Sequence, residues 1–155
     1  VDPLPSLRQR HWVIGDVHGC DRSLMSLLAV LPTADHLVFC GDVVNRGDGI
    51  EAAMNLVWTQ VRLGRATWLR GNHEQMLLDA IDEQVPGDAM KLWMRNGGNH
   101  DFLATAREHR DWLETLPLTA IRGSYLFVHA GVRPGVPLDQ QLASDLRWSR
   151  APIRE

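Results

Sequence analysis

Three short segments of the chain carry metal-ligand side chains at the point where an apolar run ends. They are Gly15–Gly19 (GDVHG), Gly41–Gly47 (GDVVNRG) and Gly71–Glu74 (GNHE). Carboxylate oxygen, imidazole nitrogen and amide oxygen form a ligand set that suits Mn²⁺, Fe or Zn²⁺. Two such ions, about 3.5–4 Å apart and bridged by one carboxylate, can hold both the attacking and the departing oxygen of an in-line phosphoryl displacement. The segments therefore predict a two-metal phosphoester hydrolase, with Asp42 as the candidate bridge.

A simpler interpretation applies to each segment alone. A Gly-Asp pair after a strand is often only a turn whose Asp caps the next helix. Three such segments in order, and a fourth at Phe127–Gly131 (FVHAG) that again places a His after an apolar run, favour the metal site. His129, the histidine of the fourth segment, could otherwise be a hydrogen-bonded core residue.

An alternation of strands and helices positions these segments. The predicted strands are His11–Ile14, which we expect to be buried, His36–Cys40 and Ala66–Leu69. The predicted helices begin with Asp21 as N-cap and run to Leu31, then cover Ile50–Leu63 and Glu74–Asp82. Repeated strand, loop and helix predict right-handed crossovers and a largely parallel sheet, with the ligands in the crevice outside the carboxyl ends of the strands.

The second half of the chain predicts shorter elements. Three stretches read as helical: Ala89–Arg95, His100–Arg107 and Arg110–Leu116. A turn is expected at Asn96–Asn99, which contains two glycines. A strand pair, Thr119–Arg122 and Tyr125–His129, and a last short helix over Asp139–Leu146 complete the prediction.

Composition narrows the class of protein. The chain has 155 residues, which is enough for one domain over 1–155, and a formal net charge of −3, which argues against a nucleic-acid surface. Its two cysteines form no CxxC pattern, which fits a reducing cytoplasm. No apolar run approaches the ~18 residues of a membrane span. We expect neither nucleic acid nor membrane as a partner, and the oligomeric state is left open.

The motifs resemble those of the calcineurin-like metallophosphoesterases, and within them the lambda-phage type of bacterial serine/threonine protein phosphatase. The similarity runs from Trp12 to about Arg150 through GDVHGC, GDVVNRG, RGNHEQMLL, NGG, LPL, FVHAG and WSR. It implies an α/β fold, a four-layer sandwich of two β-sheets flanked by helices. It also implies two divalent metal ions, for which we favour Mn and keep Fe or Zn as alternatives.

Position by position, the resemblance assigns a role to individual residues. Asp16 and His18 would bind the first metal, Asp42 both metals, and Asn72 with His129 the second.

The remaining site residues would act on the substrate. His73 resembles the imidazole that protonates the leaving oxygen, and Arg46 and Arg150 resemble the pair of guanidinium groups that hold phosphate. For Arg150 a solvated surface charge is the alternative.

One position departs from the lambda-type pattern, which has Asp where this chain has Asn45. An Asp would pair with the His73 ring and raise its basicity, whereas Asn supplies a hydrogen bond without charge. We therefore expect His73 to be protonated less often, which matters most for a poor leaving group. Symmetrical diadenosine tetraphosphate hydrolases, which are relatives, commonly depart from Asp here too. An inactivating substitution is the other explanation.

A second departure lies beyond His129. The family carries one more metal-binding histidine in a later Gly-His segment, followed by strands of the second sheet, and this chain has no His after His129. We expect a chain that lacks its C-terminal strands, with weak binding of the second ion as the alternative.

The primary prediction is a metal-dependent phosphatase of phosphomonoesters, with phosphoserine or phosphothreonine in proteins as substrate, acting by direct attack of a hydroxide that bridges two metals. A symmetrical diadenosine tetraphosphate hydrolase is the second hypothesis. A catalytically impaired phosphate-binding or regulatory module is the third.

Overall fold

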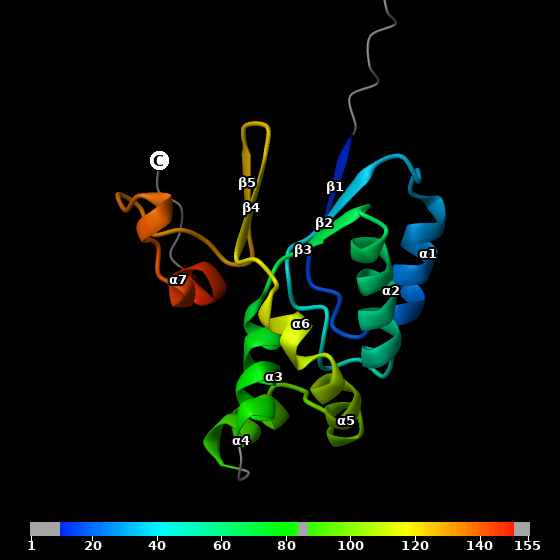
Figure 1. Cartoon of the computed structure of the whole chain (residues 1–155), viewed down its shortest axis with the longest axis vertical. Coiled ribbons are helices and arrows are strands. Elements are labelled where there is room, and N and C mark those ends of the chain that lie inside the picture. The colour runs from blue at the N-terminus through cyan, green and yellow to red at the C-terminus, as the bar shows by residue number, and fades with distance from the viewer. Residues whose placement is uncertain (1–9, 84–86, 151–155) are drawn as a thin grey trace, which may run out of the picture.

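The first sheet is parallel, as predicted. A computed structural model describes residues 10–83 and 87–150 (Figure 1). In it, β1 (His11–Ile14), β2 (His36–Phe39) and β3 (Ala66–Trp68) pair in parallel in the order β1-β2-β3. Because parallel neighbours end at the same edge of the sheet, the loops after the three strands lie close together.

Helices follow each of these strands. α1 (Asp21–Val30) and α2 (Ile50–Arg62) lie side by side on one side of the sheet, and α3 (Asn72–Asp82) leaves the carboxyl end of β3 (Figure 1). The hydrophobic core combines fully buried side chains from β2, α2 and α3: Leu37, Phe39, Val57, Leu77 and Leu78. This core holds the loops at the strand ends on a rigid support.

The second half of the chain forms a smaller sheet and the remaining helices. β4 (Thr119–Arg122) and β5 (Tyr125–Val128) make an antiparallel hairpin on the side of the first sheet away from α1 and α2 (Figure 1). α4 (Asp88–Arg95), α5 (His100–Glu108) and α6 (Arg110–Glu114) lie near α3, and η1 (Leu138–Gln140) and α7 (Ala143–Trp148) follow the hairpin. The predicted α/β class, with two sheets flanked by helices, is confirmed.

The expectation that the first strand is buried is wrong. β1 is the edge strand of its sheet, and Trp12 and Val13 are 39% and 55% exposed. Its outer side borders a cavity of about 450 Å³ shared with the β4–β5 hairpin. The apolar pattern correctly predicted a strand, but burial depends on the strand's place in the sheet.

Several element boundaries differ from the prediction by one or two residues, and three of the differences have a local cause. The N-cap of α1 is Cys20, whose N–H donates to the Val17 carbonyl, so that Asp21 is already helical. α3 begins two residues early because the Glu74 carboxylate accepts the Gly71 N–H at 2.8 Å. The last predicted helix is divided into η1 and α7, because the extended Gln141 bonds through its side chain to the preceding loop.

Among the described residues, no helix is both long enough and apolar enough to cross a membrane. The two cysteines, Cys20 and Cys40, are free thiols.

Candidate metal centre

The loops that follow β1 and β2 are joined by backbone hydrogen bonds. The N–H groups of Val17 and His18 donate to the Asp42 carbonyl at 3.0 and 2.9 Å, and the Gly19 N–H donates to the Val43 carbonyl at 2.9 Å. These bonds bring the first two predicted segments into contact, although the residues lie about two dozen positions apart in the chain.

Backbone strain in the described residues falls on the predicted site. The non-glycine residues with positive φ in ranges 10–83 and 87–150 are His18 (46°), Asp42 (54°), Asn45 (71°) and Arg46 (71°). Such conformations cost on the order of 1–3 kcal/mol each and persist where the surrounding structure enforces them. All four residues were predicted from the sequence as ligands or catalytic groups.

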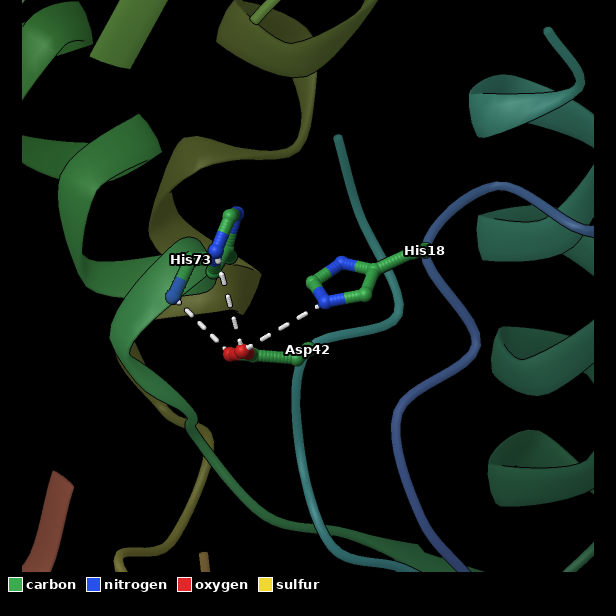
Figure 2. Close-up of side chains that lie close together, drawn as sticks. All are labelled: His18, Asp42 and His73. Carbon is green, nitrogen blue, oxygen red and sulfur yellow. Dashed lines mark hydrogen bonds and ion pairs between the residues drawn. The ribbon is translucent and has the colours of Figure 1, made fainter. Parts of the chain in front are cut away.

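Asp42 lies at the centre of the cluster. Its Oδ1 accepts the His73 backbone N–H at 2.9 Å, while its Oδ2 lies 3.9 Å from His18 Nε2, 3.8 Å from His73 Nε2 and 3.5 Å from His129 Nε2. Figure 2 shows the His18 and His73 rings converging on this carboxylate. Burial raises the pKa of the Asp42 carboxyl group, a cost that a bound cation would offset.

Two histidine rings turn Nε2 toward this carboxylate. His18 Nδ1 lies 3.2 Å from the Val44 carbonyl oxygen, and His129 Nδ1 lies 2.8 Å from the Cys40 carbonyl oxygen. A carbonyl oxygen only accepts, so Nδ1 donates in both rings and Nε2 of the neutral ring carries a lone pair. This arrangement, with Nδ1–H on a backbone carbonyl, is the usual one for a metal-ligating histidine.

The lone pairs meet other acceptors. His18 Nε2 lies 3.5 Å from Asp16 Oδ2, and His129 Nε2 lies 2.8 Å from Asn72 Oδ1. Two ligands that each lie about 2.0–2.2 Å from one ion are themselves roughly 3–4 Å apart. The separation of 3.5 Å between His18 and Asp16 falls in this range, whereas the 2.8 Å between His129 and Asn72 is a hydrogen-bond distance. A bound cation, like a proton on Nε2, would satisfy these facing acceptors.

The ligand atoms form two overlapping groups, each within 4.8 Å. One contains His18, Asp42 and His73, and the other contains Asp16, Asp42 and His129. Asp42 belongs to both groups, as a bridging carboxylate requires. The five predicted ligands lie together, and oxygen and nitrogen donors of this kind suit Mn²⁺, Fe or Zn²⁺.

His73 has a different environment from the other two rings. Its Nδ1 lies 2.9 Å from Asn45 Nδ2, and its Nε2 lies 3.3 Å from an Arg46 guanidinium nitrogen. Burial, followed by the nearby His18 and Arg46, lowers the pKa of His73 to about 3. In the structure without bound ions the ring is therefore neutral at physiological pH.

A cavity of about 190 Å³ opens beside Asp42 and His73. Arg46 and Arg150, the two predicted phosphate ligands, both line it, although they come from a loop after β2 and from the segment after α7. Arg147 and Ser149 line it as well, and sequence reasoning missed both. The WSR segment was the only available signal for them.

Sequence reasoning also missed the role of Glu74. Its buried carboxylate accepts the N–H groups of Asp42 and Val43, each at 2.8 Å, and that of Gly71 at 2.8 Å. It therefore holds the strained Asp42 backbone against the start of α3. Its position in the first turn of a helix was the signal that could have identified it as a capping residue.

The chain was compared with known proteins. Residues 10–153 match the family model described as calcineurin-like phosphoesterase. The chain belongs to this family.

The curated relatives of this chain carry two kinds of name. The chain is 38% identical to serine/threonine-protein phosphatase 1 of Salmonella typhimurium over 69% of its own length and 47% of the relative. It is also 38% identical to a symmetrical bis(5'-nucleosyl)-tetraphosphatase of Janthinobacterium sp. over 79% of this chain and 44% of the relative. The phosphoesterase thus spans about half the length of these relatives.

Solved structures agree on the fold. One is described as a candidate diadenosine tetraphosphatase. The similarity covers 92% of this chain and 60% of that structure, with a TM-score of 0.62 and 26% identity. A serine/threonine phosphatase from Saccharomyces cerevisiae covers 87% and is covered to 42%, with a TM-score of 0.60 and 23% identity, and this likeness concerns the fold alone.

Proposed function

We propose that this phosphoesterase is a metal-dependent phosphatase that hydrolyses phosphomonoesters, with phosphoserine or phosphothreonine in proteins as the substrate. The observation that carries the proposal is the convergence of the Asp42 carboxylate, the His129 ring and two arginines on one cavity, with the His18 ring 3.9 Å from the same carboxylate. Phosphoryl transfer needs charge neutralisation and positioning more than covalent chemistry, and this cluster supplies both.

Each group in the proposal has a separate task. Asp16, His18, Asp42, Asn72 and His129 would hold two divalent ions, for which we propose Mn²⁺. When bound, such ions would lower the pKa of water to provide a nucleophile near neutral pH and would neutralise phosphoryl charge. Arg46 and Arg150 would orient the phosphate oxygens through paired N–H groups. His73 would donate a hydrogen bond to the leaving oxygen.

The cavity beside the proposed ligands measures about 190 Å³, which accommodates a phosphoryl group. Arg46 also lines a second cavity, of about 530 Å³, formed with the turn after α4. The rest of the substrate would lie beyond the first cavity. We propose a cytoplasmic location, in which phosphoproteins and reduced cysteines would both be expected.

A second function is favoured by Asn45. Because Asn45 adds no negative charge beside His73, protonation of an alkoxide leaving group is weak, whereas a phosphate leaving group needs little help. The symmetrical bis(5'-nucleosyl)-tetraphosphatase relatives make a dinucleoside polyphosphate the specific alternative. Phosphate binding without turnover is the third outcome to be tested.

The experiment is a side-by-side assay with Mn²⁺ of an aryl phosphate, a phosphoserine peptide and diadenosine tetraphosphate. The proposal expects turnover of the first two substrates. Turnover of the dinucleotide alone would replace the proposal with the second function. Phosphate binding by calorimetry without turnover of any substrate would support the regulatory module.

A further inference from the structure

Three buried side chains form a chain of hydrogen bonds behind the cavity. The Trp93 indole Nε1 donates to Asn45 Oδ1 at 2.8 Å, and Asn45 Nδ2 lies 2.9 Å from His73 Nδ1. Trp93 and Asn45 are fully buried and His73 is 2% exposed, so that water cannot replace either bond. These two hydrogen bonds connect α4 to the His73 ring, which would face the proposed leaving oxygen.

The chemistry of the indole determines the direction of both bonds. An indole N–H can only donate, so the amide atom that it contacts is the oxygen. The Asn45 NH₂ group then faces His73 Nδ1, which has to accept. A neutral imidazole carries a single N–H, and in this arrangement it is at Nε2.

Without Trp93, a second arrangement would satisfy the hydrogen-bonding groups of Asn45 and His73 equally well. If the Asn45 amide turned over, its oxygen would accept from Nδ1–H. The guanidinium nitrogen of Arg46, 3.3 Å away, could then donate to the unprotonated Nε2. The Nε2–H arrangement gives up the Arg46 contact, because a guanidinium group cannot accept a hydrogen bond, and the alternative gives up the bond from the Trp93 indole. Arg46 is exposed, so water can satisfy its N–H groups, whereas Trp93 is fully buried. The Trp93 bond is therefore the costlier one to lose.

We propose that Trp93 is a positioning residue that sets the tautomer of His73 through the Asn45 amide, so that the Nε2–H points at the cavity. The role of that proton in leaving-group departure rests on the proposed function, whereas the tautomer itself does not. His73 lines the cavity, and its Nε2 lies 3.8 Å from Asp42 Oδ2. The other tautomer would present a lone pair to the leaving oxygen and could donate nothing.

The turn after α4 places the indole. Gly98 lies against the Trp93 ring so closely that a Cβ there would be 2.5 Å from a ring carbon. The Gly97 carbonyl accepts the Arg46 N–H at 2.7 Å. The turn thus contacts both Trp93 and the residue next to Asn45, which explains why two consecutive glycines follow Asn96.

The test is to measure the His73 tautomer by long-range ¹H–¹⁵N nuclear magnetic resonance on the metal-free chain at pH 7.5. In the unmodified chain we expect a protonated Nε2 and an unprotonated Nδ1. In Trp93→Phe we expect the tautomer ratio to move at least about tenfold toward Nδ1–H, the change that one ordinary hydrogen bond produces. A protonated Nδ1 in the unmodified chain would overturn the proposal even if the variant fails to fold.

A matched control separates the indole N–H from the loss of volume. Trp68 is 1% exposed, and its Nε1 has no hydrogen-bond partner among the described residues. Trp68→Phe should leave the His73 tautomer unchanged. A folded Trp93→Phe chain with an unchanged tautomer would contradict the proposal.

The Asn45→Asp variant tests whether Trp93 acts on His73 through the Asn45 amide. In Asn45→Asp both oxygens accept, so that His73 carries a proton on Nδ1 whether or not Trp93 is present. Trp93→Phe should then cause no further shift, and a shift would show that Trp93 acts by another route. Because these measurements use neither substrate nor metal, an inactive chain with the expected tautomer would refute the proposed function and not the tautomer assignment.

Discussion

At the scale of single residues, the site combines strained backbone with facing acceptors. His18 and Asp42 have positive φ, and His18 Nε2 lies 3.9 Å from Asp42 Oδ2. Such an arrangement is unfavourable in an empty site and becomes favourable around a cation. A bound cation would relieve these unfavourable interactions, and we therefore expect them to increase the affinity of the site for metal.

Asp42→Asn should remove the bridge between the two ions. The amide has no charge to share, so we expect loss of at least one bound ion per chain and a fall in turnover of about 10³-fold or more. Metal content by elemental analysis, measured with the activity, checks this. Asp48→Asn, which removes an exposed carboxylate in the same loop, is the matched control. Unchanged metal content in Asp42→Asn would show that the bridge is elsewhere.

Asn45→Asp should help the release of poor leaving groups. A carboxylate beside His73 Nδ1 favours the protonated ring, so turnover of an alkyl phosphate should rise about tenfold or more, and that of an aryl phosphate should change little. The ratio of the two rates is the measurement. Asn55→Asp adds the same charge at an exposed position of α2 and should leave the ratio unchanged. An equal rise for both substrates would argue against a role in leaving-group protonation.

At the scale of elements, the site depends on contacts between loops that different strands deliver. The Glu74 carboxylate, on α3, accepts backbone N–H groups from the loop after β2. The turn after α4 contacts Arg46 in that same loop. Two helices therefore hold the strained loop from opposite ends, and a change in either should be felt at the cavity.

Gly97→Ala should impair the site more than it destabilises the fold. Gly97 has φ of 85°, and an added Cβ would lie 2.7–2.9 Å from Arg46 atoms. We expect about 1 kcal/mol of lost stability, and about tenfold weaker inhibition by inorganic phosphate because Arg46 is displaced.

The control is Gly64→Ala, after α2, where φ is 68° and a Cβ would meet no atom within 4 Å. It should lose less stability than Gly97→Ala in denaturant unfolding, because only its φ is unfavourable, and it should keep its affinity for phosphate. Equal phosphate affinity in both variants would contradict the inferred role of the turn.

At the scale of the whole molecule, the proposed ligands come from positions 16 to 129 of a chain that we propose to be one domain. An unfolded chain cannot bring them together, so bound ions stabilise only the folded state.

Mn²⁺ at a hundredfold excess over its dissociation constant should stabilise the chain by about 2.7 kcal/mol, which raises the midpoint of thermal unfolding by about 5–10 °C. A chelator should reverse the shift. The comparison is a thermal scan with chelator and with Mn²⁺, for the unmodified chain and for Asp42→Asn, in which the shift should be smaller. The same shift in both chains would place the stabilising ion outside this cluster.

Much of this molecule could be predicted from local sequence. The strands, most helix boundaries and the candidate ligands at the strand ends follow from short apolar runs, glycines and adjacent polar residues, because these signals act over a few positions. The assignment of these residues as metal ligands stays a prediction. The parallel pairing followed from the repeated order of elements. The proximity of Asp16 and Asp42 followed from parallel strands that end at one edge, whereas His129 follows β5 of the separate antiparallel hairpin and reaches them through tertiary packing.

Only the tertiary structure decided the contacts between distant segments. The strand order leaves β1 at the sheet edge, and packing brings the Trp93 indole to Asn45 across 48 positions of sequence. It also brings Arg147 to the cavity that Arg46 lines. No local pattern encodes these contacts, because each depends on how whole elements pack. The sequence by itself therefore determined which groups could do the chemistry, and the packing of α4 and α7 determined which neighbours orient them.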